Sequence, residues 1–395
     1  MDRTLHHGAP ADVGMSPERL ERLRGLCAGW VEQGIMPALQ VVVARHGTIV
    51  LHGAWGRLGP AADAPSLTVE SIFCIGSITK LFTAVAIMCL VEDGLLGLTR
   101  PVQEYVAEFV GDGKAEVMMH HLLTHTSGMR NADQEAYLKA AIADRRVAAP
   151  EPMPHLRDDE LLHMRCCDAL LDAPLSSAPG ERMSYSNYGY RLLAEIVAQV
   201  SRQPLERFVQ TRILEPLGLA DTSYTNLPPQ RLNRLVRRTD NVPWAIMNRP
   251  DLVARLFWGF GAAHSTALDL ATFTQLFLNG GVYGGRRILS PVTVAEMTRN
   301  QIPGLGGSWA GENFPSVSWG YGWGIQGVKK SPREGSLLSP GAFLQTGIGM
   351  HLVWADPVYD LVGVYLSVAP RMATARKGDW CADLFANAVG ASIVE

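Results

Sequence analysis

The spacing of apolar and polar positions changes along the chain and separates three regions. Residues 16–33 carry apolar side chains at helical spacing, and Ser16 followed by proline and glutamate is typical of a helix start. Residues 39–56 have the apolar, β-branched composition of two strands, and a turn is predicted at Arg45-His46-Gly47. The first region therefore combines a helix with a β-hairpin.

Helical spacing dominates the middle of the chain, from Ile78 to about Ala220. The expected helical segments are an apolar one at 78–96, an amphipathic one at 101–110, and two further stretches at 158–173 and 188–214. Loops are expected where polar residues and proline gather, at 131–154, 226–230 and 241–244.

The last third returns to strands after two more expected helices, at 267–281 and 292–300. Strands are predicted within 319–328, 342–357 and 360–369. Strands at both ends around a helical middle favour an α+β fold, in which one sheet is built from both chain ends. We therefore predict an α/β domain from residues 1–75 and 260–395, with an inserted, mainly helical domain at 76–259.

Composition narrows the class of protein. The chain has 395 residues, 47% of them hydrophobic and 18% charged, and a formal net charge of −3. This balance disfavours a nucleic-acid or anionic-lipid partner. No uninterrupted apolar run of about 18 residues and no apolar leader segment occur in the sequence, so we expect a cytoplasmic protein without a membrane span. The six scattered cysteines have neither disulfide-scaffold nor zinc-ribbon spacing, and no metal or cofactor is expected.

The first candidate for chemistry is Ser77-Ile78-Thr79-Lys80, where the most apolar helix begins. The i, i+3 spacing places Lys80 one turn after Ser77 on the same face. A serine hydroxyl needs a neighbouring base to act as a nucleophile, and burial on an apolar helix lowers the pKa of a lysine. Alone the pattern is weak, because a helix cap followed by a surface lysine also produces it.

Two later motifs strengthen this interpretation. Tyr185-Ser186-Asn187 lies in a polar segment just before a strongly patterned helix, and a tyrosine beside a lysine can relay protons. Gln345-Thr346-Gly347 lies in a predicted strand, where a glycine often marks the close approach of a ligand or another backbone. An exposed strand amide there could donate to an oxyanion.

Taken together, the chain resembles the serine β-lactamase and penicillin-binding-protein superfamily, in its class C and family VIII carboxylesterase branch. The three motifs match Ser-x-x-Lys, Tyr-x-Asn and the position of Lys-Thr-Gly in order and spacing. The resemblance continues through scaffold segments at 37–50, 121–128, 215–224, 261–273, 288–301 and 353–357. It implies a β-lactamase-like fold with the active site between the two domains.

The resemblance also implies acyl transfer through a covalent intermediate on Ser77. Lys80 and Tyr185 would share the general acid and base roles, and the amides of Ser77 and Ile348 would form the oxyanion hole. The substrate-binding residues that it implies are Asn187, Gln345, Thr346 and Gly347.

One departure from the family pattern bears on the substrate. Gln345 is neutral where β-lactam-hydrolysing relatives usually have a lysine, and losing such a charge-assisted contact costs about 1.5–3 kcal/mol. We therefore predict a carboxylesterase acting on small neutral esters, although Arg333 could supply a charge. The alternatives are an acyltransferase, a β-lactamase, D-amino-acid peptidase or amidase with weak β-lactam turnover, and a non-catalytic scaffold. The sequence does not determine the oligomeric state.

Two other patterns carry less weight. His121 and His125 have the i, i+4 spacing of metal ligands, but the glutamate of an HExxH motif is missing, and packing or loop hydrogen bonds are expected instead. The segment Gly306-Gly307-Ser308-Trp309-Ala310 lacks the last glycine of a Gly-x-Ser-x-Gly elbow.

Overall fold

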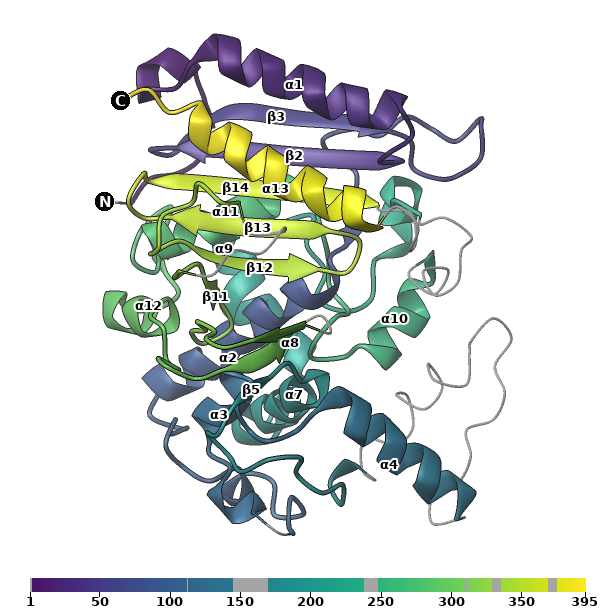
Figure 1. The fold of residues 1–395 in the computed structure, drawn as a ribbon, viewed down its shortest axis with the longest axis vertical. Helices are drawn as coiled ribbons and strands as arrows, with labels where there is room; N and C mark the ends of the chain where they lie inside the picture. Colours follow the sequence, from purple (N-terminus) through teal and green to yellow (C-terminus); the bar gives the residue numbers. More distant parts are fainter. Residues whose placement is uncertain are drawn as a thin grey trace.

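The computed structural model describes residues 2–111, 113–144, 170–237, 248–309, 312–328, 335–368 and 375–395. Its main sheet has the spatial strand order β1-β3-β2-β14-β13-β12-β11 (Figure 1). Neighbouring strands are antiparallel, but β1 runs parallel to β3. The strands are β1 (His6–His7), β2 (Ala38–Arg45), β3 (Thr48–Gly56), β11 (Gly324–Ile325), β12 (Phe343–Gly347), β13 (His351–Asp356) and β14 (Leu361–Val368).

The sheet joins the two ends of the sequence, because β2 pairs with β14 along its whole length. Ala38 lies opposite Val368 at one end of this pair. The predicted hairpin is confirmed: β2 and β3 are antiparallel, and His46 and Gly47 between them have positive φ. The predicted sheet, built from the N-terminal and C-terminal strands, is therefore confirmed.

Two hydrophobic cores lie on opposite faces of this sheet. Val41 and Val43 of β2 belong to the outer core, beneath α1 (Pro17–Glu32) and α13 (Ala375–Ala391). Val42 and Ala44 belong to the inner core, with α2 (Thr79–Glu92) and α11 (Ala267–Leu278). Because successive side chains of a strand point to opposite faces, burial on both sides explains the apolar run at 41–44 in β2.

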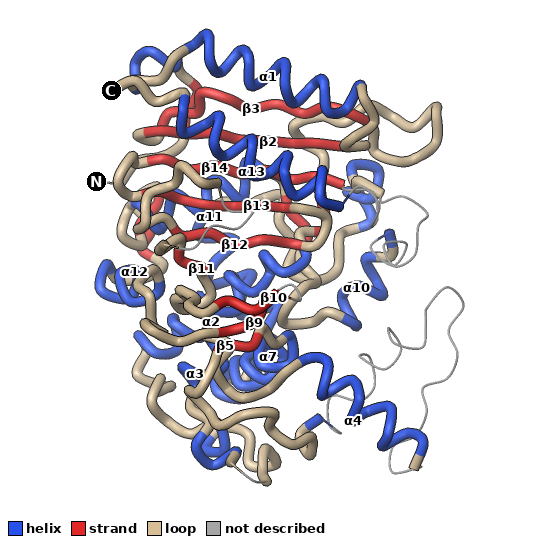
Figure 2. Tube along the Cα trace, in the orientation of Figure 1, coloured by secondary structure: helices blue, strands red, loops and turns tan. Residues whose placement is uncertain are grey.

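Most of the remaining helices lie below the sheet in the view of Figure 2, around α2. They are α3 (Met119–Leu123), α4 (Asn131–Ala143), α7 (Asn187–Ser201), α8 (Leu205–Val209), α9 (Glu215–Leu217), α10 (Pro250–Leu256) and α12 (Pro291–Met297). The short strands form smaller sheets. Strand β4 (Phe73–Cys74) pairs with β6 (His264–Ser265), and β7 (Val282–Tyr283) pairs with β8 (Arg286–Arg287). Strand β9 (Gly307–Trp309) lies between β5 (Met183–Ser184) and β10 (Glu312–Phe314).

Several local predictions are confirmed. Helix α1 begins where expected, and the Ser16 hydroxyl caps it by accepting from the Arg19 amide at 3.2 Å. Helix α2 begins just after Ser77 and ends at Glu92. The expected helices at 267–281 and 292–300 correspond to α11 and α12.

Other local predictions are wrong. Residues 131–143 form helix α4 instead of a loop, and Gln134, Leu138 and Ala141 are its buried stripe. The expected helix at 101–110 is a single 3-10 turn (Val102–Glu104) followed by separate turns. A segment this short has little helical stability of its own, so tertiary packing decides its conformation. Only Gly324–Ile325 forms a strand within 319–328, and the terminal helix α13 was not predicted.

Some expectations concern residues that the structure does not describe. These are the loop residues 145–154, the helical segment as far as residue 169, the loop at 241–244, and Arg333. The domain limits at residues 75/76 and 259/260 stay a prediction.

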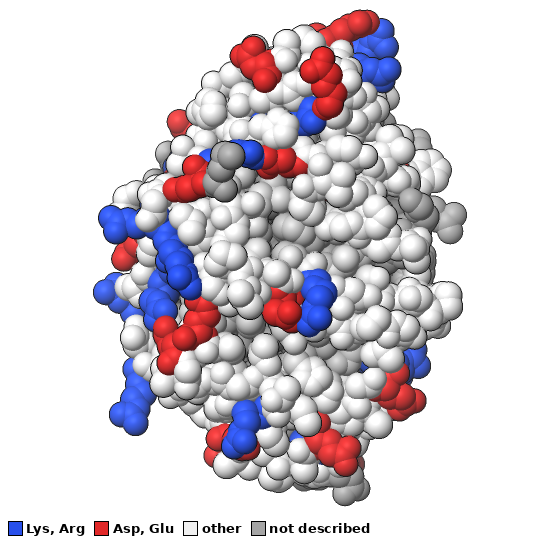
Figure 3. Space-filling view, turned by 90° about the vertical axis from the view of Figure 1, so that its left-hand side faces the viewer, with Lys and Arg blue, Asp and Glu red and all other residues white. Residues whose placement is uncertain are grey.

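Among the described helices, none combines the length and apolar character needed to cross a membrane. On the face shown in Figure 3, basic side chains gather along one side with acidic ones among them, and most of the surface there carries neither.

Candidate active site

Ser77 lies in a 3-10 turn, η2 (Gly76–Ile78), that leads directly into α2. The Thr79 hydroxyl fastens this turn, because it donates to the Gly76 carbonyl at 2.6 Å and accepts from the Ala263 amide at 3.0 Å. Just before this turn, β4 pairs with β6, which directly follows Ala263 in the chain. The position of Ser77 is thus fixed by the backbone on both sides of it.

Lys80 is fully buried, and its amine reaches three oxygen atoms. Nζ lies within hydrogen-bond distance of Ser77 Oγ, at 3.2 Å, and donates to Asn187 Oδ1 at 2.9 Å and to the Phe260 carbonyl at 3.0 Å. Burial lowers the pKa of the Lys80 amine well below its ordinary value, because a charged amine loses its hydration there. The structure therefore places a readily deprotonated amine beside the hydroxyl of Ser77.

Tyr185 is half-buried and lies in the chain between β5 and α7. The Ser186 hydroxyl caps α7 by accepting from the Gly189 amide at 3.2 Å, which fixes the backbone next to Tyr185. Burial raises the pKa of the Tyr185 phenol, and a hydrogen bond with the Ser77 hydroxyl acts in the opposite direction. The Lys80 amine lies 4.9 Å from the centre of the Tyr185 ring.

Strand β12 approaches Ser77 through its last residues. A Cβ at Gly347 would lie 2.3 Å from the Ile75 carbonyl oxygen, so only glycine fits this approach without movement. Gly76 has φ of +54°, and a Cβ on it would lie 3.0 Å from the Ile348 amide nitrogen. The Ile348 amide is therefore next to the residue that precedes Ser77. An oxyanion hole formed by the amides of Ser77 and Ile348 would need these two segments to lie close together.

The Gln345 side chain is occupied by backbone groups. It is 2% exposed, its amide donates to the Gly322 carbonyl at 2.9 Å, and its oxygen accepts from the Thr346 amide at 3.0 Å. Thr346 is buried as well. Substrate binding by these two residues stays a prediction, because their described contacts are internal.

A hollow beside Tyr185 contains two arginines that the sequence reasoning did not single out. It is lined by residues 130–132, 181, 182, 184, 185, 306–308, 313 and 314. Arg130 is held by Asp133, with 2.7 Å between Nε and Oδ2. Arg182 is exposed and forms no ion pair within the described part of the chain.

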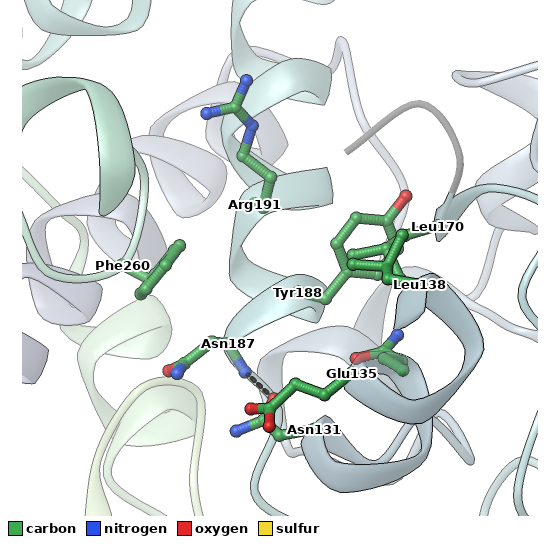
Figure 4. A pocket seen from close by; sticks show the side chains of 9 residues that line it. Asn131, Glu135, Leu138, Leu170, Asn187, Tyr188, Arg191 and Phe260 are labelled. Carbon is green, nitrogen blue, oxygen red and sulfur yellow. Dashed lines mark hydrogen bonds between the residues drawn. The ribbon is translucent and has the colours of Figure 1, made fainter. Parts of the chain in front are cut away.

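A second, small pocket lies beside Asn187 and Phe260, the two residues that hold Lys80 together with Ser77 (Figure 4). Leu138, Leu170 and Tyr188 contribute much of its lining. Asn131 lines both hollows, and its Oδ1 accepts from the Asn187 amide at 2.9 Å. This anchor was missed because 131–143 was expected to be a loop.

The structure brings Ser77, Lys80, Tyr185 and Asn187 together, with Gly347 and Ile348 beside them. The part of the Phe260 carbonyl was not predicted either, since a backbone acceptor leaves no signal in a sequence.

No group of three or more histidine, cysteine, aspartate or glutamate side chains suited to a metal ion occurs among the described residues. The His121 Nδ1 accepts from the Met118 amide at 3.1 Å.

Comparisons with known proteins agree with this geometry. The family model described as Beta-lactamase matches residues 23–388. A curated relative from Salmonella agona (strain SL483), named "Putative D-alanyl-D-alanine carboxypeptidase", is 26% identical over 94% of this chain and 88% of its own length.

Solved structures share the fold. A family VIII carboxylesterase superposes with a TM-score of 0.67 at 20% identity, over 94% of this chain and 98% of the other. A protein described as "EstCE1, a hydrolase with promiscuous acyltransferase activity" gives a TM-score of 0.70 at 20% identity, over 93% and 98% of the two chains. The predicted β-lactamase-like fold is confirmed.

Proposed function

Because the chain belongs to the Beta-lactamase family, we propose that it is a serine hydrolase that cleaves small carboxylic esters through an acyl group on Ser77. Ser77 Oγ would attack the ester carbonyl, and the amides of Ser77 and Ile348 would stabilise the oxyanion. Water would then release the acid and regenerate the hydroxyl.

The hydrogen bonds of Lys80 carry this proposal. A neutral amine has two N–H groups and one lone pair. The carbonyl oxygens of Asn187 and Phe260 can only accept, so they occupy both N–H groups. The lone pair then faces the third neighbour, Ser77 Oγ, at 3.2 Å. Lys80 is thus arranged to take the proton of Ser77 as the acyl bond forms.

Tyr185 would act on the leaving group. Because burial raises the pKa of its phenol, Tyr185 carries a proton at neutral pH and can donate it. Its hydrogen bond with Ser77 supports this role, because the leaving oxygen would depart from the carbon that Ser77 attacks. Since Lys80 and Tyr185 both face Ser77, their protonation is coupled, and the pH dependence belongs to the pair.

One feature supports neutral esters as substrates. The Gln345 side chain adds no charge, and its hydrogen bonds are made with backbone groups.

The test is hydrolysis of p-nitrophenyl esters of graded acyl length, beside nitrocefin, with Ser77→Ala as the blank. We expect rapid turnover of short esters and covalent labelling by a fluorophosphonate, both lost in Ser77→Ala, at a nearly unchanged melting temperature. Wild-type protein that neither hydrolyses esters nor labels better than Ser77→Ala would overturn the proposal.

A second candidate is a peptidase or β-lactam hydrolase that binds a substrate carboxylate. Arg182, which lines the hollow beside Tyr185, favours it, and so does the name of the Salmonella relative. Two esters that differ only in a terminal carboxylate would distinguish the candidates. A lower KM for the charged ester, together with nitrocefin turnover, would favour the second.

Acyl transfer is a third candidate, supported by the described activity of EstCE1. Product analysis with and without added alcohols separates it from hydrolysis. Preferential formation of the exchanged ester would identify a transferase, and release of the free acid would identify a hydrolase.

A further inference from the structure

His125 packs against the ring of Tyr185. It is 1% exposed and follows α3 in the chain. Its ring centre is 4.3 Å from that of Tyr185, with an angle of 35° between the planes. The rings of Tyr190 and Trp319 lie close by, at 5.1 and 5.2 Å between centres.

Two hydrogen bonds tie His125 to the backbone on both sides of Tyr185. The Ser184 amide donates to the His125 carbonyl at 2.8 Å. The Ser186 amide donates to the His125 Nδ1 at 3.2 Å. The residues before and after Tyr185 are therefore held by one histidine, whose ring also packs against the phenol ring.

The hydrogen bond from Ser186 defines the chemical state of the imidazole. Nδ1 can accept only if it carries no proton, so the neutral tautomer has its hydrogen on Nε2. Burial lowers the pKa of His125 well below its ordinary value, which keeps this acceptor available. The Nε2 atom has no hydrogen-bond partner among the described residues.

The backbone of His125 is unusual as well. Its φ of +60° lies in the left-handed region, which only a few per cent of non-glycine residues adopt, with asparagine, aspartate and histidine among the more frequent. Such conformations persist where the surrounding structure enforces them, and they cluster at functional sites. A side chain that only filled space would need neither this backbone nor an acceptor aimed at Ser186.

We propose that His125 is a positioning residue that holds the Tyr185 phenol against Ser77 through its carbonyl, its Nδ1 and its ring face. The inference rests on the proposed function, since it assigns Tyr185 a part in proton transfer. His125 itself does not contact the reacting atoms. Its effect should therefore appear in kcat, with KM for a small ester nearly unchanged.

Two substitutions separate the acceptor from the backbone conformation. His125→Asn keeps an acceptor oxygen near the position of Nδ1, and asparagine tolerates the left-handed conformation. His125→Gly also tolerates it but offers no side-chain acceptor. We expect kcat to fall about 10- to 100-fold in His125→Gly, as displacement of a catalytic group does, and to fall less than about 5-fold in His125→Asn.

The deciding measurement repeats His125→Gly in a Tyr185→Phe background. If His125 acts through the phenol hydroxyl, the glycine change should lower kcat less than about 3-fold there. An equal loss in both backgrounds, or equal rates for the glycine and asparagine variants, would overturn the inference. The rate of fluorophosphonate labelling gives a second readout that does not depend on the ester chosen.

Failure of the proposed function would be recognised separately. If wild-type protein labels at Ser77 but hydrolyses no ester, the substrate class is wrong, and the labelling rates still test His125. Thermal unfolding of each variant identifies any loss that comes from an unstable fold.

Discussion

The two cores on either side of the sheet differ in what they surround. The outer core packs apolar side chains of α1 and α13 on the strands, and Phe385 lies within 6 Å of the rings of both Trp354 and Tyr365. The inner core is larger, and the buried amine of Lys80 lies among its apolar side chains.

This difference separates stability from function. Burial of a cation is unfavourable unless it is paired, and the hydrogen bonds described for Lys80 have only neutral partners. The same burial produces the neutral amine that catalysis requires. The described side chains that make up the outer core are apolar or aromatic, so we expect it to contribute stability without affecting the chemistry.

Among substitutions that keep Ser77, the largest loss of rate is expected from Tyr185→Phe. Removing the phenol hydroxyl should lower kcat about 10²- to 10⁴-fold, as loss of a general acid does. Tyr190→Phe is the matched control, because that buried hydroxyl donates to the Leu123 carbonyl at 3.0 Å, away from Ser77. Steady-state kinetics of both variants tests this, and similar rates for the two would contradict the role of Tyr185.

Gly347→Ala tests the contact between the sheet and the turn that carries Ser77. The added Cβ would push β12 away from Ile75, so the Ile348 amide would move and kcat should fall about 10- to 10²-fold. Gly341→Ala serves as the control, since a Cβ there meets only ordinary contacts near 3.9 Å. An unchanged rate in Gly347→Ala would show that this amide does not bind the oxyanion.

The pH dependence tests the charge state of Lys80. Below the lowered pKa of its amine, the base is protonated, and kcat/KM should fall about tenfold per pH unit. Stability should change in the same direction: between the folded and unfolded pKa values the unfolded chain binds one more proton, so this group makes stability rise with pH. A rate that increases toward acid pH would contradict a neutral Lys80.

The smallest effect on rate is expected from Phe385→Ala in the outer core. Removal of this buried ring should cost about 3–5 kcal/mol of unfolding free energy, while kcat per folded molecule stays unchanged. Denaturant unfolding and active-site titration measure the two quantities. A matching loss of kcat would show that the two cores are coupled.

The local pattern of the sequence predicted the elements that carry the site. Ser77 at the start of an apolar helix, Ser186 before a patterned helix and Gly347 in a strand were all accessible from spacing and residue type. The reasoning failed where local preference was weak. Helix α4 is stabilised by the packing of Leu138 and Ala141, and Asn131 was missed with it.

The sequence by itself determined which chemical groups are present and in which order, because hydrophobic period, caps and motifs depend on neighbours within a few residues. Only the tertiary structure decided how those groups face one another. Lys80 and Asn187 are 107 positions apart, and Ser186 and His125 are 61 apart. Contacts between residues so far apart in the sequence follow from the packing of whole helices and strands. The same packing gave the Gln345 side chain its backbone partners and placed the His125 ring against that of Tyr185.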